Sequence, residues 1–161
     1  MMHTNAILLQ RLFNSLNQHD HEAMAACYHL KATFTDIAFE LRGRKQIHAM
    51  WHMICQPEGQ AGDIAALFNV VHADDRRGWV NLVDDYTFSS TGHKVTNVID
   101  SHFYFEDGLI VEQRDFCDPG AWAAMALGGV SGFLASQFHF LRNFKARQML
   151  SKFVENHSEY Q

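Results

Sequence analysis

Apolar and polar residues alternate along positions 95–118 and predict a β-hairpin that turns at positions 106–108. A turn of three residues, with Gly108 in the left-handed conformation of a bulge, pairs Phe105 with Leu109. A turn of two residues would instead put the phenylalanines of the first strand on the face of the charged residues of the second. Because a slip of one residue turns every side chain over, the apolar pattern decides, and it favours the three-residue turn.

In this register one face of the hairpin is apolar but contains several polar residues. It carries Asn97, Ile99, Ser101, Phe103, Phe105, Val111, Gln113, Asp115 and Cys117. A polar group among apolar neighbours is unfavourable unless it is paired. The asparagine, serine, glutamine and aspartate of this face therefore mark a candidate site.

The rest of the pattern predicts an α+β fold. Helices are expected at 4–17, capped by Thr4, at 21–30, capped by Asp20, at 44–55, at 120–127 and from 130 to about 157; strands are expected at 32–41, 63–73, 78–89, 95–105 and 111–117. Three helices followed by an antiparallel meander place the helices on one face of the sheet. The last helix either packs across the sheet or forms a dimer seam, and its basic residues also fit an amphipathic helix at a membrane surface.

Composition indicates a single folded domain of the cytoplasm. The chain has 161 residues, of which 47% are hydrophobic, and a formal net charge of −5. Lysine and arginine form no run, which argues against nucleic acid as a partner. The three cysteines are far apart and indicate reduced core thiols. The sequence contains neither a signal-peptide pattern nor an apolar run that could span a bilayer, so a membrane is not an expected partner.

Strand 78–89 also places a carboxylate on an apolar face, because Asp84 alternates with Val80, Leu82, Tyr86 and Phe88. Asp36 follows Phe34 on the first strand in a similar way. If the sheet curls, Asp36, Asp84 and Asp115 converge in one cavity lined by Trp51, Tyr86 and Phe103. Burial and mutual repulsion would raise the pKa of such carboxylates, so that they exchange protons near neutral pH. The alternative is that each one is a hydrogen-bonded structural group or faces solvent.

The eleven histidines raise the question of a metal site. His48 and His52 lie one helical turn apart, and His19 and His21 flank a helix cap, but no third ligand has a recognisable spacing. We therefore predict no metal. No phosphate-binding loop or nucleophile elbow is present, and we predict no cofactor. Cys117 fits a buried thiol better than a nucleophile.

Three segments resemble a known superfamily. They are L-N-Q-H-D-H-E-A-M-A-A-C-Y-H-L-K-A-T-F-T-D at 16–36, L-R-G-R-K-Q-I at 41–47 and H-F-Y-F-E-D-G-L-I-V-E-Q-R-D at 102–115. Together they resemble the nuclear transport factor two-like superfamily, and within it the SnoaL-like and ketosteroid-isomerase-like proteins. The resemblance implies a cone domain over 1–118, made of a curved antiparallel sheet around helices, with a deep apolar pocket and a homodimer. Residues 119–161 would form a helical extension packed on the same domain.

The resemblance also assigns residues. Asp36 matches the isomerase general base. The isomerase oxyanion-hole acid falls at Ser101, or at Asp100 if a bulge intervenes, and the isomerase tyrosine falls at Leu12. Steroid isomerase activity is therefore not expected. SnoaL-type cyclases use an acid near the last strand, and Asp115 fits that role.

Two functions from different classes follow. The first is a cofactor-independent isomerase, cyclase or hydratase-type lyase that acts on a small, mostly apolar carbonyl compound, with Asp36 or Asp115 as base. Asp84 is the third candidate catalytic residue and, with Tyr86, Asn97 and Gln113, would orient the substrate or stabilise an enolate. The other predicted substrate contacts are Trp51, Ser101 and Phe103. The second is a non-catalytic module that holds an apolar ligand or a partner chain in the same cone. A role of the C-terminal helix in assembly or at a lipid surface is a third alternative, since the fold hosts many functions.

Overall fold

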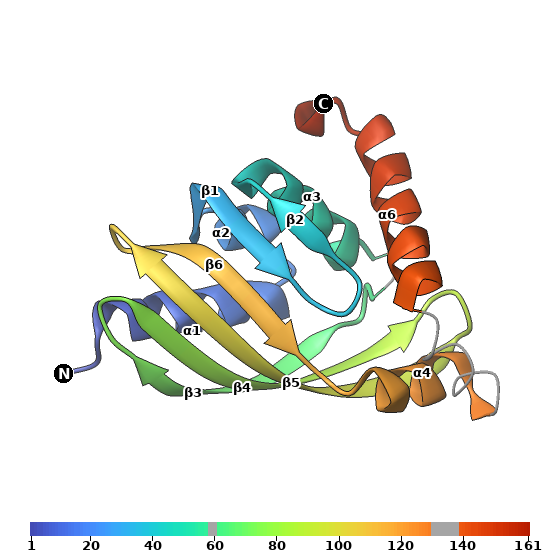
Figure 1. The fold of residues 1–161 in the computed structure, drawn as a ribbon, viewed down its shortest axis with the longest axis horizontal. Helices are drawn as coiled ribbons and strands as arrows, with labels where there is room; N and C mark the ends of the chain where they lie inside the picture. The colour runs from blue at the N-terminus through green and yellow to red at the C-terminus, as the bar shows by residue number, and fades with distance from the viewer. Residues whose placement is uncertain (58–60, 130–138) are drawn as a thin grey trace.

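The computed structural model describes residues 1–57, 61–129 and 139–161, and it has the predicted α+β fold (Figure 1). Its six-stranded sheet has the order β2-β1-β6-β5-β4-β3. The strands are β1 (Tyr28–Thr35), β2 (Glu40–Arg42), β3 (Ala65–Ala73), β4 (Arg77–Phe88), β5 (His93–Glu106) and β6 (Leu109–Phe116). The predicted meander from β3 to β6 is antiparallel throughout. The expectation of a purely antiparallel sheet is wrong at one place, because β1 pairs with β6 in parallel.

The N-terminal helices follow the predicted apolar period, with two corrections. Helix α1 (Thr4–Asn17) buries its predicted apolar face, but its cap is His3, whose Nδ1 accepts the Asn5 N–H. Helix α2 (His21–Ala25) is capped by Asp20 as predicted and is shorter than expected, because the chain enters β1 at Tyr28. Helix α3 (Arg44–Cys55) has its predicted bounds.

The predicted strand at 32–41 is interrupted by a turn at 36–39: residues 32–35 belong to β1 and residues 40–41 to β2, and the two strands pair antiparallel. The chain turns after Thr35 because Asp36 holds it: its Oδ1 accepts the backbone N–H groups of Ala38 at 2.7 Å and Phe39 at 2.6 Å. An aspartate that bonds the backbone two and three residues ahead favours a turn over a continued strand.

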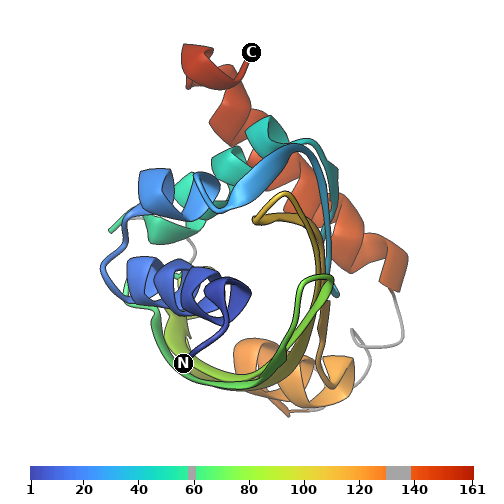
Figure 2. The same ribbon diagram turned by 90° about the vertical axis from the view of Figure 1, so that its left-hand side faces the viewer.

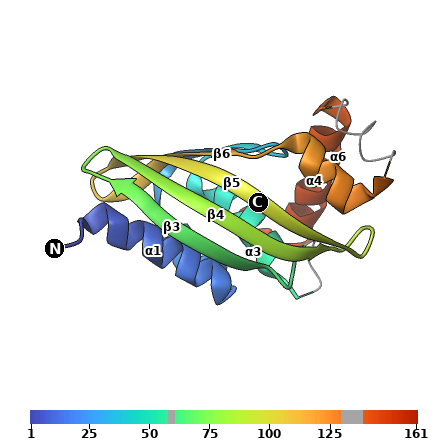
Figure 3. The same ribbon diagram turned by 90° about the horizontal axis from the view of Figure 1, so that it is seen from below.

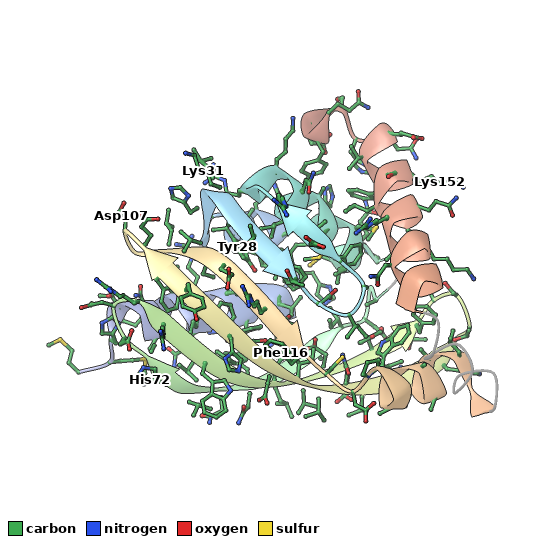
Figure 4. All side chains as sticks on the ribbon, viewed as in Figure 1. Tyr28, Lys31, His72, Asp107, Phe116 and Lys152 are labelled. Carbon is green, nitrogen blue, oxygen red and sulfur yellow. The ribbon has the colours of Figure 1, made fainter. Side chains whose placement is uncertain are left out.

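The β5–β6 hairpin has the two-residue turn that the apolar pattern argued against, combined with a bulge that neither of the two registers contains. Glu106 pairs with Leu109, so the turn contains only Asp107 and Gly108, both with positive φ, and Asp107 stands at the tip (Figure 4). The predicted three-residue turn is therefore wrong. A bulge shifts the register between Tyr104 and Phe105, and this extra residue restores the predicted facing. Gln113 and Asp115 lie on the inner face, with Ile110 in place of Val111.

The sheet curves like part of a cone wall, and α1 closes its open side (Figure 2). Seen from below, α1 runs beside β3 (Figure 3). Apolar side chains from α1, α3 and the inner strand faces fill the space between these elements. The fully buried members include Leu9, Phe13, Phe34, Met50, Phe103 and Ile110. The polar residues discussed below are set into this core.

The C-terminal part adds helices outside the sheet. Helix α4 (Pro119–Leu127) is capped by Asp118 and packs on β5. Helix α6 (His139–Glu155) lies against α3, and the short helix η1 (Ser158–Tyr160) follows it (Figure 1). The predicted last helix began at 130, and positions 130–138 lie outside the described residues. No helix of the described residues is both long and apolar enough to cross a membrane.

Candidate active site inside the curved sheet

Three adjacent strands carry polar residues on the inner face of the sheet, as the alternation predicts. Asp84 of β4 lies opposite Asn97 of β5, and Ser101 of β5 lies opposite Asp115 of β6. Directly opposite residues of an antiparallel pair share one face. Asp84 and Asn97 are buried, and Ser101 and Gln113 have no exposed surface at all. The inner face therefore contains a polar site in an otherwise apolar core.

A chain of hydrogen bonds links α3 to Asp115. The Trp51 Nε1 donates to the Tyr28 hydroxyl at 3.1 Å, and that hydroxyl donates to Gln113 Oε1 at 2.5 Å. The Gln113 amide then donates to both oxygens of Asp115, at 3.0 and 3.2 Å. Each donor fixes the orientation of the next group, so the Asp115 carboxylate is held in place from one side.

Asp115 has a pKa close to neutral. Burial raises the pKa of its carboxyl to about 7, and the negative charge of Asp36 adds to this rise. The hydrogen bond from Gln113 opposes it, because a donor stabilises the charged form. The Ser101 hydroxyl also lowers the pKa of Asp115, although its oxygen makes no regular hydrogen bond to any described residue. At neutral pH, Asp115 can therefore accept or release a proton.

The pKa of Asp84 is raised further than that of Asp115. Burial increases the pKa of this carboxyl to about 8, and the charges of Asp115 and then Asp85 contribute. Its Oδ1 is buried and has no hydrogen-bond partner among the described residues. A buried carboxyl oxygen that lacks a partner is unfavourable unless a ligand or water pairs with it. Asp84 is therefore a neutral acid at neutral pH, and its Oδ1 is a buried polar atom without a partner among the described residues.

The other predicted site residues lie at the margins of this site. Trp51 and Phe103 are core residues, and Phe103 packs edge-on against Phe13. The Tyr86 hydroxyl accepts the Trp122 Nε1 at 2.7 Å, and burial raises the pKa of Tyr86 to about 12. Tyr86 is therefore a neutral, anchored phenol.

Asp36 borders the site from the β1–β2 turn. Its charge raises the pKa values of Asp115 and Tyr86, so the three predicted aspartates are electrostatically linked. Asp36, Asp115 and the half-buried Cys117 line a groove of about 600 Å³ where β1, β2 and β6 end. This groove gives Asp115 contact with the outside of the sheet. Its lining does not include Asp84, Trp51, Tyr86 or Phe103, so the groove does not unite the three aspartates with the predicted aromatic walls.

Two features of the site were missed from the sequence. The helix predicted over 21–30 includes Tyr28, so the sequence pattern does not mark its hydroxyl as the link between Trp51 and Gln113. Trp122 lies in the C-terminal segment, and no local pattern connects it with Tyr86.

Of the two positions that the resemblance offers for the oxyanion-hole acid, Ser101 faces inward, whereas Asp100 is exposed and accepts the Trp79 Nε1 at 3.4 Å. Leu12 is fully buried in the core.

Comparison with known proteins agrees with this architecture. The family model of the SnoaL-like domain matches residues 9–113. No curated protein matches the sequence.

Among solved structures, a protein of ketosteroid isomerase-like fold from Catenulispora acidiphila, in complex with trimethylamine, aligns with a TM-score of 0.65 at 11% identity, over 76% of this chain and 93% of its own. A candidate SnoaL-like polyketide cyclase from Jannaschia sp. has a TM-score of 0.65 at 15% identity, over 76% and 91% of the two chains. An LEH-like epoxide hydrolase of M. tuberculosis has a TM-score of 0.59 at 14% identity, over 86% and 95%. At these identities the likeness concerns the fold.

Proposed function

Because this chain belongs to the SnoaL-like domain family, matched over residues 9–113, we propose that it is a cofactor-independent enzyme of the isomerase or cyclase type. Its substrate would be a small, mostly apolar compound with a carbonyl group. The reaction would move a proton at the carbon next to that carbonyl. The likeness to a candidate polyketide cyclase supports the reaction class at the level of the family.

Asp115 is the base in this proposal. As a carboxylate it takes the proton from the carbon beside the carbonyl. The electrons of the broken C–H bond form a carbon–carbon double bond, and the carbonyl electrons move to oxygen, which gives an enolate. A carboxylate whose pKa lies near the working pH suits both the removal and the return of a proton. Held by Gln113, Asp115 returns the proton to another carbon, or to the oxygen formed when the enolate carbon attacks a second carbonyl.

Asp84 stabilises the enolate. Since its pKa is about 8, it is mostly protonated at neutral pH and can donate a hydrogen bond to the enolate oxygen. A protonated aspartic acid in an apolar site acts in this way in ketosteroid isomerase. Asn97, directly opposite Asp84, and Ser101, opposite Asp115, are the further polar contacts that we assign to the substrate.

The remaining predicted residues shape the site. We assign Trp51, Tyr86 and Phe103 to its apolar walls. Asp36, whose carboxylate bonds two backbone N–H groups of the turn, tunes Asp115 by its charge and is not the base. We carry over from the family resemblance a homodimer and a small apolar ligand as parts of the same proposal.

The observation that carries the proposal is the pair of inward carboxyl groups, one of them with a buried oxygen that lacks a partner. Two measurements test it. The first is an NMR titration of labelled aspartates, which should place the apparent pKa values of the two groups near 7 and 8. Ordinary values for both would overturn the proposal.

The second measurement is proton exchange in D2O, followed by proton NMR on a panel of small apolar ketones and β-keto esters. Asp115→Asn should slow enzyme-catalysed exchange by at least about 100-fold. Asp100→Asn is the matched control, because Asp100 is exposed on β5 and is not among the charges that act on Asp84 or Asp115. If panel compounds bind but are not exchanged, the chain is the non-catalytic binding module instead.

A further inference from the structure

A cluster of histidines lies outside the curved sheet, where α2 and α3 meet the C-terminal end of the chain. His21 comes from α2, His48 and His52 from α3, and His157 follows α6. The rings of His21 and His52 are stacked with centroids 3.7 Å apart. The sequence showed the pair on α3 and the pair His19 and His21 around a helix cap, and no third ligand at a recognisable spacing. The fold supplies the missing groups from other elements.

Three of these side chains converge like the ligands of a metal ion. His21 Nδ1 and His48 Nε2 are 2.9 Å apart, and His48 Nε2 is 3.7 Å from Glu22 Oε1. All three ligand atoms lie within 4.8 Å of one another. Ligands that sit about 2.0–2.1 Å from a tetrahedral zinc ion are about 3.3 Å apart, and the two shorter distances lie on either side of this value.

The two imidazoles are held in position before any ion arrives. The His21 ring is stacked on His52, and the His48 and Tyr160 rings pack edge to face with their centroids 5.1 Å apart. The His48 side chain is only 17% exposed, whereas Glu22 is 76% exposed and can turn toward an ion at little cost. The present hydrogen bond between the two rings places a proton on one of the two facing nitrogens. This proton need not leave the protein when a metal binds, because a neutral imidazole can carry its proton on the other ring nitrogen.

We propose that His21, Glu22 and His48 form a binding site for one divalent transition-metal ion of the zinc class. Two imidazoles and a carboxylate suit zinc, whereas magnesium and calcium prefer oxygen ligands. Three protein ligands leave a fourth position of a tetrahedral ion for water. The site is separate from the carboxyl groups inside the sheet and does not depend on the function proposed for them.

A second group offers an alternative position for an ion. His52, His157 and Glu159 also bring three ligand atoms within 4.8 Å. There, however, His157 Nδ1 donates to the Phe153 carbonyl at 2.7 Å, and His52 Nδ1 lies 3.0 Å from the Tyr160 hydroxyl. We assign these two rings to packing the C-terminal segment on α3. Separate variants distinguish the two groups.

The test uses the full chain without a polyhistidine tag, stripped of metal with EDTA. Zinc chloride is titrated by calorimetry, and cobalt(II) is added to record its visible spectrum. We expect one equivalent of zinc to bind and cobalt to give a tetrahedral spectrum. His48→Gln should weaken zinc binding by at least about 100-fold and Glu22→Gln by about 10-fold. His102→Gln on the exposed face of β5 and His157→Gln should bind as the wild type does.

Three results would overturn the assignment. The first is no zinc binding by the wild-type chain, and the second is unchanged binding by both His48→Gln and Glu22→Gln. The third is a loss confined to His157→Gln, which would place the ion in the second group. If circular dichroism shows that His48→Gln does not fold, the exposed Glu22 decides alone, since its replacement by Gln leaves the core untouched.

Discussion

Replacing Asp84 with asparagine should change the pH dependence of stability in a way that a surface aspartate would not. Asparagine has nearly the same shape, but it has no charge to bury. In the folded wild type, burial raises the pKa of this carboxyl from 3.8 to about 8, so the fold favours the protonated form. Its contribution to stability is therefore fully present below about pH 4 and is lost as pH rises through about 8.

The magnitude follows from the shift. One pKa unit corresponds to about 1.4 kcal/mol, so the free energy of unfolding should fall by about 1.4 kcal/mol per pH unit between the two pKa values. Between pH 5 and pH 7 this amounts to about 3 kcal/mol in the wild type that is absent from Asp84→Asn. The variant should therefore gain relative stability as the pH rises to about 8, and the difference should then level off. Asp115 titrates in the same range in both proteins, and because its charge contributes to the raised pKa of Asp84, the difference reports the coupled pair of carboxyl groups.

Urea denaturation at half-unit steps from pH 4.5 to 8.5 measures this difference. Asp100→Asn is the control: Asp100 is exposed on β5 and is not among the charges that act on Asp84 or Asp115, so the difference of this variant from the wild type should stay nearly constant over this range. A constant difference for Asp84→Asn would show that the Asp84 carboxyl is hydrated or paired, and it would refute the reasoning. A variant that becomes less stable with rising pH would do the same.

Two further changes test the packing around the site. Tyr28→Phe leaves the Trp51 N–H and the Gln113 carbonyl oxygen without their buried partner, and should lower the free energy of unfolding by about 1–3 kcal/mol in urea denaturation; no loss would mean that water replaces the hydroxyl. Gly78→Ala should cost about 1–3 kcal/mol in the same measurement, because a Cβ there would lie 2.8 Å from the Phe105 ring. An unchanged free energy of unfolding in Gly78→Ala would show that the Phe105 ring moves aside freely.

The sequence predicted those parts of the fold that depend on local periodicity. Helix α3 has its predicted bounds, and strands β4 and β5 bury alternate residues as expected, which places Asp84, Asn97 and Ser101 on the inner face. It failed where one residue is inserted or where a turn replaces a strand. The turn at Asp36 could not be told from a strand, because its neighbours are good β-formers.

The hairpin shows how two local errors can cancel. The apolar pattern correctly demanded that Gln113 lie on the face of Phe103, but it attributed this to a longer turn. The structure has a shorter turn and places the extra residue at a bulge. Periodicity detects which residues share a face, whereas it cannot locate the position at which a register changes. Local periodicity also cannot predict hydrogen bonds between residues far apart in the sequence, such as that between Trp122 and Tyr86.

The parallel pairing of β1 with β6 has a consequence for the order of folding. The strands β3 to β6 can assemble through short turns, but Tyr28 and Gln113, which meet across β1 and β6, are 85 residues apart. Closing so long a loop is entropically unfavourable until other contacts already hold its ends near each other. Tyr28 should therefore dock on Gln113 late, after β3 to β6 have paired. Until it does, Asp115 already stands on the sheet but lacks the support that orients its carboxylate.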